Sequence, residues 1–201
     1  MLSKSMTSVS EALNKFQDIG FTCEYKYDGE RAQIHYMENG SVEIYSRNAQ
    51  RNTEKFPDVV AAVSRLKKRT VSSFVIDCEL VAYDRAKQKF FPFQVLSTRS
   101  RKNVAASGIN VDVCIFAFDL LYLNGQALLL ENLKIRREHL YASFEEKSGL
   151  LQFATSLTSN DTEEIQKFLD EVVDATFILI KVLRYNGRSG VPNIKYSWRP
   201  T

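Results

Sequence analysis

Residues 112–123 constrain the fold most, because they are almost entirely apolar and end at an Asn-Gly turn signal. Their length and their aromatic and β-branched side chains are typical of a strand buried inside a sheet. Residues 74–84 and 176–183 have the same character. Residues 31–46 contain a second Asn-Gly pair between alternating segments, which predicts a β-hairpin. The sequence therefore predicts several strands, of which the apolar ones are expected to be buried.

Four segments between these strands have apolar side chains at helical spacing, which predicts helices. They are residues 8–18, 54–68, 130–144 and 161–174. Asp161 and Glu164 have the spacing of a capping box, which predicts that the last helix begins there. With 201 residues, of which 44% are hydrophobic, the chain can bury a sizeable core. We predict an α+β fold in which antiparallel sheets pack against helices.

Charge and cysteine content exclude some classes of function and leave others open. The formal charge of +3 does not indicate nucleic acid, so any DNA contact must come from local basic clusters. Three cysteines lie far apart in apolar segments without zinc-ligand spacing, and we expect buried, reduced thiols: Cys23, Cys78 and Cys114. The first twenty residues contain no apolar run of membrane-spanning length, and we expect a monomer without a membrane partner.

The main chemical signal is Lys26-Tyr27-Asp28-Gly29-Glu30-Arg31, called the lysine motif below. Alternation places Lys26 on the same strand face as Glu24 and Asp28, so the strand holds its amine in one direction. A lysine amine attacks only when it is neutral, which requires desolvation or neighbouring cations. The guanidinium of Arg31 is suited to phosphate oxygens. A surface strand with alternating charges is the other interpretation of this short motif.

The lysine motif resembles that of the nucleotidyltransferases, which include DNA ligases, RNA ligases and messenger-RNA capping enzymes. Further segments, in the same order, resemble the ATP-dependent DNA ligases, most closely the eukaryotic DNA ligase I type. These segments are YSRN (45–48), FVIDCELVAYD (74–84), PFQVLSTRSRK (92–102) and AFDLLYLNG (117–125). The resemblance covers about residues 18–183 and implies a nucleotidyltransferase (ATP-grasp-like) core with an AMP pocket.

The resemblance implies that Lys26 is the catalytic nucleophile that takes AMP from ATP. AMP then passes to the 5′-phosphate of nicked double-stranded DNA, and the strand is sealed during replication, repair or recombination. It implies Mg²⁺ as a cofactor and a nuclear location. A catalytically impaired nucleotide- or DNA-binding remnant and a capping-type guanylyltransferase are the alternative interpretations.

Six further residues match positions that hold the nucleotide in the family. Glu24 would contact the adenine, whereas Arg31 and Arg47 would reach phosphates. Glu79 would bind the ribose or the metal. Phe118 would stack on the adenine, although a phenylalanine in such an apolar run is often a core residue. Lys181 ends the last apolar strand.

The densest basic loop of the chain is predicted to contact the DNA backbone through Arg99, Arg101 and Lys102. Lys67, Lys68 and Arg69 would extend this basic surface, whereas we expect Arg136 and Arg137 to be exposed on a helix.

The chain departs from the family pattern towards its end. Thr176 and Phe177 stand where the family has Glu-Gly, and Lys195 and Arg199 only partly replace the last phosphate-binding lysines. We therefore expect a partial adenylation domain over 1–183, incomplete at its C-terminus. An irregular tail over 184–201 would follow, without the OB-fold domain or the N-terminal DNA-binding domain.

Overall fold

The computed structural model describes residues 4–5, 21–100, 108–173, 179–184 and 196–198. The chain forms two compact units. The first unit comprises residues 1–27, 129–135 and 154–201, and the second comprises residues 28–128 and 136–153. The boundary falls inside the lysine motif, between Tyr27 and Asp28, so each unit is described by itself.

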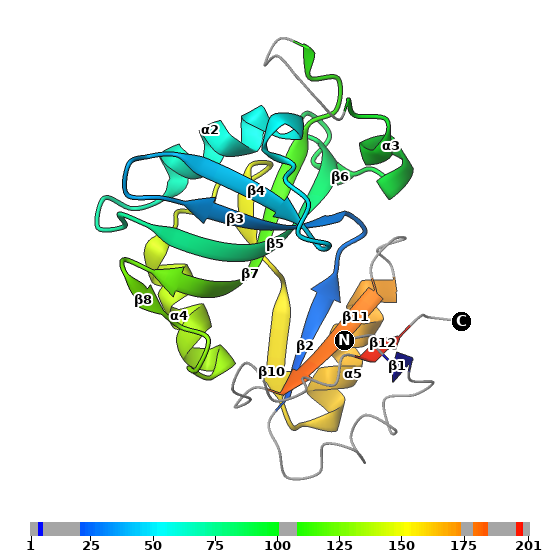
Figure 1. Cartoon of the computed structure of the whole chain (residues 1–201). Coiled ribbons are helices and arrows are strands. Elements are labelled where there is room, and N and C mark those ends of the chain that lie inside the picture. Colours follow the sequence, from blue (N-terminus) through cyan, green and yellow to red (C-terminus); the bar gives the residue numbers. More distant parts are fainter. Residues whose placement is uncertain (1–3, 6–20, 101–107, 174–178, 185–195, 199–201) are drawn as a thin grey trace. The chain divides into compact units, whose positions relative to one another are not determined.

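The second unit is built on a mostly antiparallel sheet with the strand order β4-β3-β5-β7-β8 (Figure 1). Strands β6 and β9 pair with β5 and β7, and β9 runs parallel to β7. The bounds are β3 Glu30–Tyr36, β4 Val42–Ser46, β5 Phe74–Asp84, β6 Lys89–Phe90, β7 Val113–Leu123, β8 Gln126–Ala127 and β9 Leu151–Phe153. The long central strands β5 and β7 correspond to two of the predicted apolar strands, 74–84 and 112–123.

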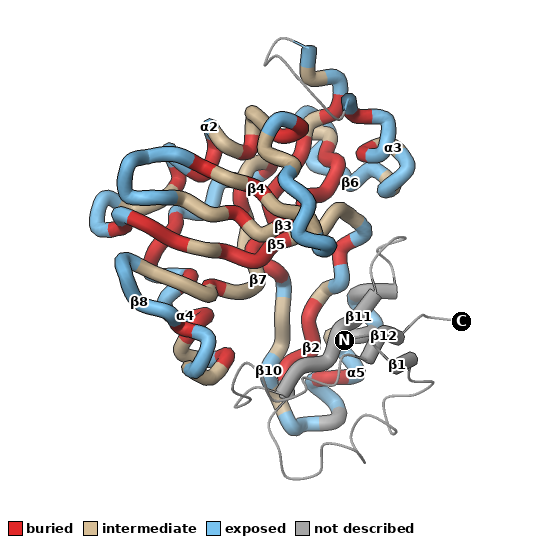
Figure 2. Tube along the Cα trace, in the orientation of Figure 1, coloured by how far each residue is buried: buried red, intermediate tan, exposed pale blue. Residues whose placement is uncertain are grey.

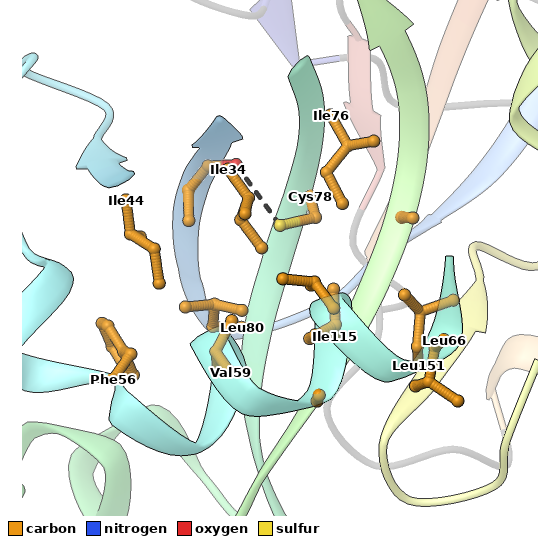
Figure 3. Close-up of a cluster of buried hydrophobic side chains, with 14 of the residues drawn as sticks. Ile34, Ile44, Phe56, Val59, Leu66, Ile76, Cys78, Leu80, Ile115 and Leu151 are labelled. Atoms are coloured by element: carbon orange, nitrogen blue, oxygen red, sulfur yellow. Dashed lines mark hydrogen bonds between the residues drawn. The ribbon is translucent and has the colours of Figure 1, made fainter. Parts of the chain in front are cut away.

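One face of this sheet is covered by the core of the unit. Helix α2 (Pro57–Leu66) contributes Val59, Val63 and Leu66 to this core, and the strands contribute Ile34, Ile44, Ile76, Leu80 and Ile115 (Figure 3). The thiol of Cys78 donates to the carbonyl oxygen of Ala32 at 3.4 Å within the same cluster. Figure 2 shows that most residues of β5, which lies between β3 and β7, are buried. The remaining helices are η1 Thr53–Lys55, α3 Phe93–Ser97 and α4 Leu133–Ser143.

The first unit contains a second sheet with the order β1-β12-β11-β2-β10. Its strands are β1 Lys4–Ser5, β2 Phe21–Lys26, β10 Ser156–Ser159, β11 Leu179–Arg184 and β12 Tyr196–Trp198. Helix α5 (Thr162–Val173) begins as predicted, because Asp161 Oδ1 accepts the amide protons of Glu163 and Glu164 at 2.7 and 3.1 Å.

The predicted α+β class is confirmed, and three of the four predicted helices are present as α2, α4 and α5. The fourth, over residues 8–18, lies outside the described residues. Within 184–201, where we predicted irregular structure, Tyr196–Trp198 forms a strand that pairs with β11. No helix in the described part of the chain is long and apolar enough to span a membrane.

The three cysteines are buried and unpaired, as predicted. Burial raises the pKa of Cys23 and of Cys114 to about 12, and it raises the pKa of Cys78 well above its ordinary value. A thiol attacks as its thiolate, so burial suppresses the reactivity of all three.

Candidate functional site

Lys26 is the last residue of β2 in the first unit. Its side chain is exposed and forms no hydrogen bond or ion pair with any residue that the structure describes. The strand continues from a buried segment, since Thr22, Cys23 and Glu24 are each at most 2% exposed. Glu24 shares the strand face of Lys26 by alternation, but it is buried where Lys26 is exposed. Two neighbouring strands, β10 and β11, fix β2 and therefore the place from which the amine projects.

Glu24 lies directly across the sheet from Lys181, because β2 and β11 are antiparallel with these two residues in register. Glu24 is 1% exposed, and burial of a carboxylate is costly unless it is paired. Lys181 lies in a strand, as the sequence predicted, and the structure adds that this strand pairs it with Glu24. Thr176 and Phe177, where the chain departs from the family pattern, lie outside the described residues.

Arg31 is the centre of a polar cluster in the second unit. Its Nε and Nη2 donate to the two carboxylate oxygens of Asp77, with an Nε to Oδ1 distance of 2.9 Å. The carboxylate of Asp77 raises the pKa of Arg31 above its ordinary value. The Nη1 group of Arg31 makes no hydrogen bond with the described residues, so it can donate to a ligand oxygen.

Phe118 and Glu79 lie around the same guanidinium. The Arg31 Cζ atom lies 5.7 Å from the centroid of the Phe118 ring, and Glu79 is the cross-strand partner of Arg31. Both Glu79 and Phe118 are half-buried. An aromatic face, a carboxylate and a guanidinium can together bind a base, a hydroxyl group and a phosphate. The structure therefore brings together three of the predicted nucleotide-binding residues.

A β-bulge places Phe118 and the core residue Leu120 on opposite faces of the sheet, although they are two positions apart. In the pairing of β5 with β7, Cys78 faces Ala117 and Asp77 faces Asp119, so Phe118 is an extra residue in β7. Bulges redirect side chains and shift the alternation of a strand by one position. Alternation with Leu120 would make Phe118 a core residue, whereas the observed register places it opposite the core face, as a platform for a base requires.

Gly29 of the lysine motif packs closely against β5. A Cβ atom at this position would lie 2.3 Å from the carbonyl oxygen of Leu80 and 3.0 Å from Cγ of Glu79. Only glycine allows this approach without a backbone shift. The sequence predicted either a sharp turn or a close approach to a ligand, and the observed neighbour is the protein backbone.

Glu30 is held by two polar side chains that the sequence did not identify. Its carboxylate accepts from Asn52 Nδ2 at 2.7 Å and from Lys55 Nζ at 2.5 Å. Lys55 is 9% exposed, so this ion pair is largely shielded from water. The sequence offered one indication of these partners: Asn52 and Lys55 both follow the YSRN segment within ten residues.

The basic residues that were predicted to contact phosphates differ in their surroundings. Arg47 is exposed beyond the end of β4, and its side chain forms no ion pair with a described residue. Arg99 is buried, and its guanidinium pairs with Asp58. Arg99 therefore stabilises the fold in this structure, and its placement gives no support to DNA contact. Arg101 and Lys102 lie outside the described residues.

Arg136 and Arg137 correct another expectation, because both are buried rather than exposed on helix α4. Arg136 forms a forked ion pair with Asp119, and Arg137 Nε donates to the carbonyl oxygen of Phe118. The helix periodicity predicted α4, but it could not show which carboxylate would lie opposite these side chains.

Comparison with known proteins gives a consistent result. The family described as ATP dependent DNA ligase domain matches residues 1–177. DNA ligase 1 of Arabidopsis thaliana is 70% identical over 174 residues, which are 87% of this chain and 22% of that protein. DNA ligase 1 of Saccharomyces cerevisiae is 43% identical over 91% of this chain and 24% of that protein. The chain thus spans about a fifth to a quarter of the length of these relatives.

Solved structures agree on the fold. The ligase domain of LigD from M. tuberculosis has a TM-score of 0.69 at 21% identity, over 98% of this chain and 57% of that chain. The mycobacterial DNA ligase D complexed with ATP and MES has a TM-score of 0.69 at 20% identity, over 99% of this chain and 59% of that chain.

Proposed function

Because this chain belongs to the family of ATP-dependent DNA ligases, we propose that it catalyses the covalent transfer of AMP from ATP to Lys26. The Lys26 amine attacks the α-phosphorus, a P–N bond forms, and the P–O bond to pyrophosphate breaks. The amine proton passes to solvent and pyrophosphate leaves. Nucleophilic catalysis of this kind divides one difficult transfer into two easier ones.

The observation that carries the proposal is the cluster around Arg31. An aromatic ring, a carboxylate and a free guanidinium edge gather off the core face of one sheet. In the proposal, Phe118 stacks on the adenine, Glu79 accepts a ribose hydroxyl, and Nη1 of Arg31 binds phosphate. Glu24 and Lys181 are proposed as further nucleotide-binding residues, and the exposed Arg47 adds a second phosphate contact.

Mg²⁺ is proposed as the cofactor, with Glu79 as one ligand. No group of three or more potential metal-ligating side chains occurs among the residues that the structure describes. In proteins Mg²⁺ usually takes most of its ligands from phosphate oxygens and water. The ion would neutralise charge on the phosphates.

The second half of the proposed reaction uses nicked double-stranded DNA. A 5′-phosphate oxygen attacks the lysyl-AMP phosphorus and the P–N bond breaks, after which the 3′-hydroxyl displaces AMP and seals the strand. Arg101 and Lys102 are proposed to contact the DNA backbone. We further propose that the chain works as a monomer in the nucleus during replication, repair and recombination, by analogy with its DNA ligase 1 relatives.

Lysyl-AMP formation tests the proposal directly. The chain is incubated with ATP labelled at the α-phosphate and with Mg²⁺, then denatured, and the protein-bound label is measured. We expect acid-labile label on the unchanged chain and on Lys89→Ala, which removes an exposed strand lysine on β6. Lys26→Ala should carry no label. Equal labelling of Lys26→Ala would refute the assignment.

Transfer to DNA is tested with the labelled lysyl-AMP form. Nicked duplexes with a 5′-phosphate should release the label from the protein, whereas matched duplexes with a 5′-hydroxyl should not. Equal release by the two duplexes would contradict a transfer to the 5′-phosphate. Competition with unlabelled GTP should leave labelling unchanged, which separates this activity from a guanylyltransferase. A fluorescent fusion in cells tests the nuclear location.

A further inference from the structure

The bulge in β7 has two consecutive residues that leave the core face. Val113, Ile115 and Ala117 belong to the core, and the next core residue of the strand is Leu120 rather than a residue at 119. Phe118 and Asp119 therefore both lie between core positions, although simple alternation would send one of them inward. A segment with one extra residue can in principle pair in more than one register, so its geometry must be specified by other contacts.

Two buried arginines of helix α4 supply such contacts. Nε and Nη2 of Arg136 donate to the two oxygens of Asp119 at 2.7 and 2.9 Å. Nε of Arg137 donates to the carbonyl oxygen of Phe118 at 3.3 Å. The Asp119 carboxylate also accepts the amide proton of Leu120 at 2.9 Å. Each residue from Phe118 to Leu120 thus takes part in a hydrogen bond of this network.

Simple packing does not explain these arginines. Arg136 is 1% and Arg137 is 5% exposed, and taking a guanidinium out of water costs free energy that well-packed apolar side chains do not incur. A forked ion pair is directional, because both N–H groups must meet both carboxylate oxygens. Such a pair specifies one geometry for Asp119 and, through the chain, for the preceding residue.

We propose that Arg136 and Arg137 are positioning residues that hold the β7 bulge in the geometry in which Phe118 presents its ring to adenine. The inference rests on the proposed function and deepens it, because it explains how one residue of the nucleotide site is placed. In this assignment Phe118 binds the base, and Asp119 links the arginine contact to Phe118 through the backbone. The two arginines touch neither ATP nor Lys26.

The test compares Arg136→Met and Arg136→Lys with a matched control, Arg85→Met. Arg85 donates to the carbonyl oxygen of Val113 at 3.4 Å and pairs with Asp112 at 2.8 Å, so it makes the same kinds of contact at the opposite end of β7. The KM for ATP and the maximal rate of lysyl-AMP formation are measured for each full chain. Hydrogen exchange at the Leu120 amide reports on the bulge without any nucleotide.

We expect Arg136→Met to raise the KM for ATP about tenfold or more, because a misplaced binding group weakens binding steeply. The maximal labelling rate should change less than about threefold, since Lys26 is untouched. Arg136→Lys should recover part of the KM, and Arg85→Met should leave it unchanged. Exchange at the Leu120 amide should accelerate in Arg136→Met alone. If Arg136→Met does not fold, the same measurements are made on Asp119→Asn, which keeps the side-chain shape and removes the charge.

Two results would overturn the inference. The first is unchanged exchange at the Leu120 amide in both the Arg136→Met and the Asp119→Asn chains. The second is faster exchange with an unaltered KM for ATP, which would make the arginines structural only. If the unchanged chain forms no lysyl-AMP, the proposed function fails, and ATP affinity measured by equilibrium dialysis replaces KM in the comparison. If it also binds no ATP, the positioning role falls with the proposed function, while hydrogen exchange still decides whether the arginines hold the bulge.

Discussion

Gly29→Ala is expected to destabilise the second unit, because the added methyl group has no space. Its carbon would lie 2.3 Å from the carbonyl oxygen of Leu80, about 1.1 Å closer than the 3.4 Å at which ordinary contact begins. The Leu80 atoms belong to the backbone of the central strand β5, which cannot rotate away as a side chain can. Relief therefore requires that β3 and β5 move apart next to Arg31.

The size of the effect follows from two opposing contributions. Overpacking costs about 1–3 kcal/mol, and a rigid backbone neighbour places this site in the upper half of that range. Alanine restricts the unfolded chain more than glycine does, and this effect stabilises the folded state by about 0.4–1 kcal/mol. The expected net loss is about 2 kcal/mol, which lowers the melting temperature by about 4–8 °C for a chain of this size.

Thermal unfolding followed by circular dichroism measures this loss. Gly108→Ala is the matched control, because a Cβ atom there would meet no atom within 4 Å. The control should melt at or slightly above the temperature of the unchanged chain. Gly29→Ala should also form lysyl-AMP more slowly, since the shift separates Arg31 from Glu79. If the two alanine variants melted at the same temperature, the argument from close approach would be wrong.

Three further predictions concern groups outside the bulge. Lys55→Met should lower the free energy of unfolding by about 2–4 kcal/mol in urea titrations, because it leaves Glu30 shielded from water without its charged partner. Hydrogen bonds from Arg51 and Thr53 hold the pKa of Glu43 at about 2, below its ordinary 4.5. The resulting stabilisation is complete above about pH 4.5 and is lost as pH falls towards 2. We therefore expect the free energy of unfolding, measured by urea titration, to fall less from pH 5 to pH 3 in Glu43→Gln than in the unchanged chain. A thiol reagent at pH 8 should modify the folded protein very slowly and the urea-unfolded protein quickly at Cys23, Cys78 and Cys114.

The burial of Arg99 and Arg136 could not be read from the sequence. An arginine on a helix or in a basic loop is usually exposed, and local spacing contains no information about a carboxylate 41 or 17 positions away. Pairing with Asp58 and Asp119 became visible only when the strands and helices were packed together. For this reason the predicted DNA contact of Arg99 finds no support, while a positioning role for Arg136 emerged.

The sequence by itself determined where most strands and helices lie, because apolar periodicity follows the geometry of each element. It also identified the lysine motif, since a strand-borne lysine followed by Asp-Gly is a local pattern. Only the tertiary structure decided that Phe118 and Leu120 lie on opposite faces, because a bulge depends on the register between β5 and β7 rather than on either strand alone. Contacts between distant segments set that register, and they place Arg31 beside the ring of Phe118.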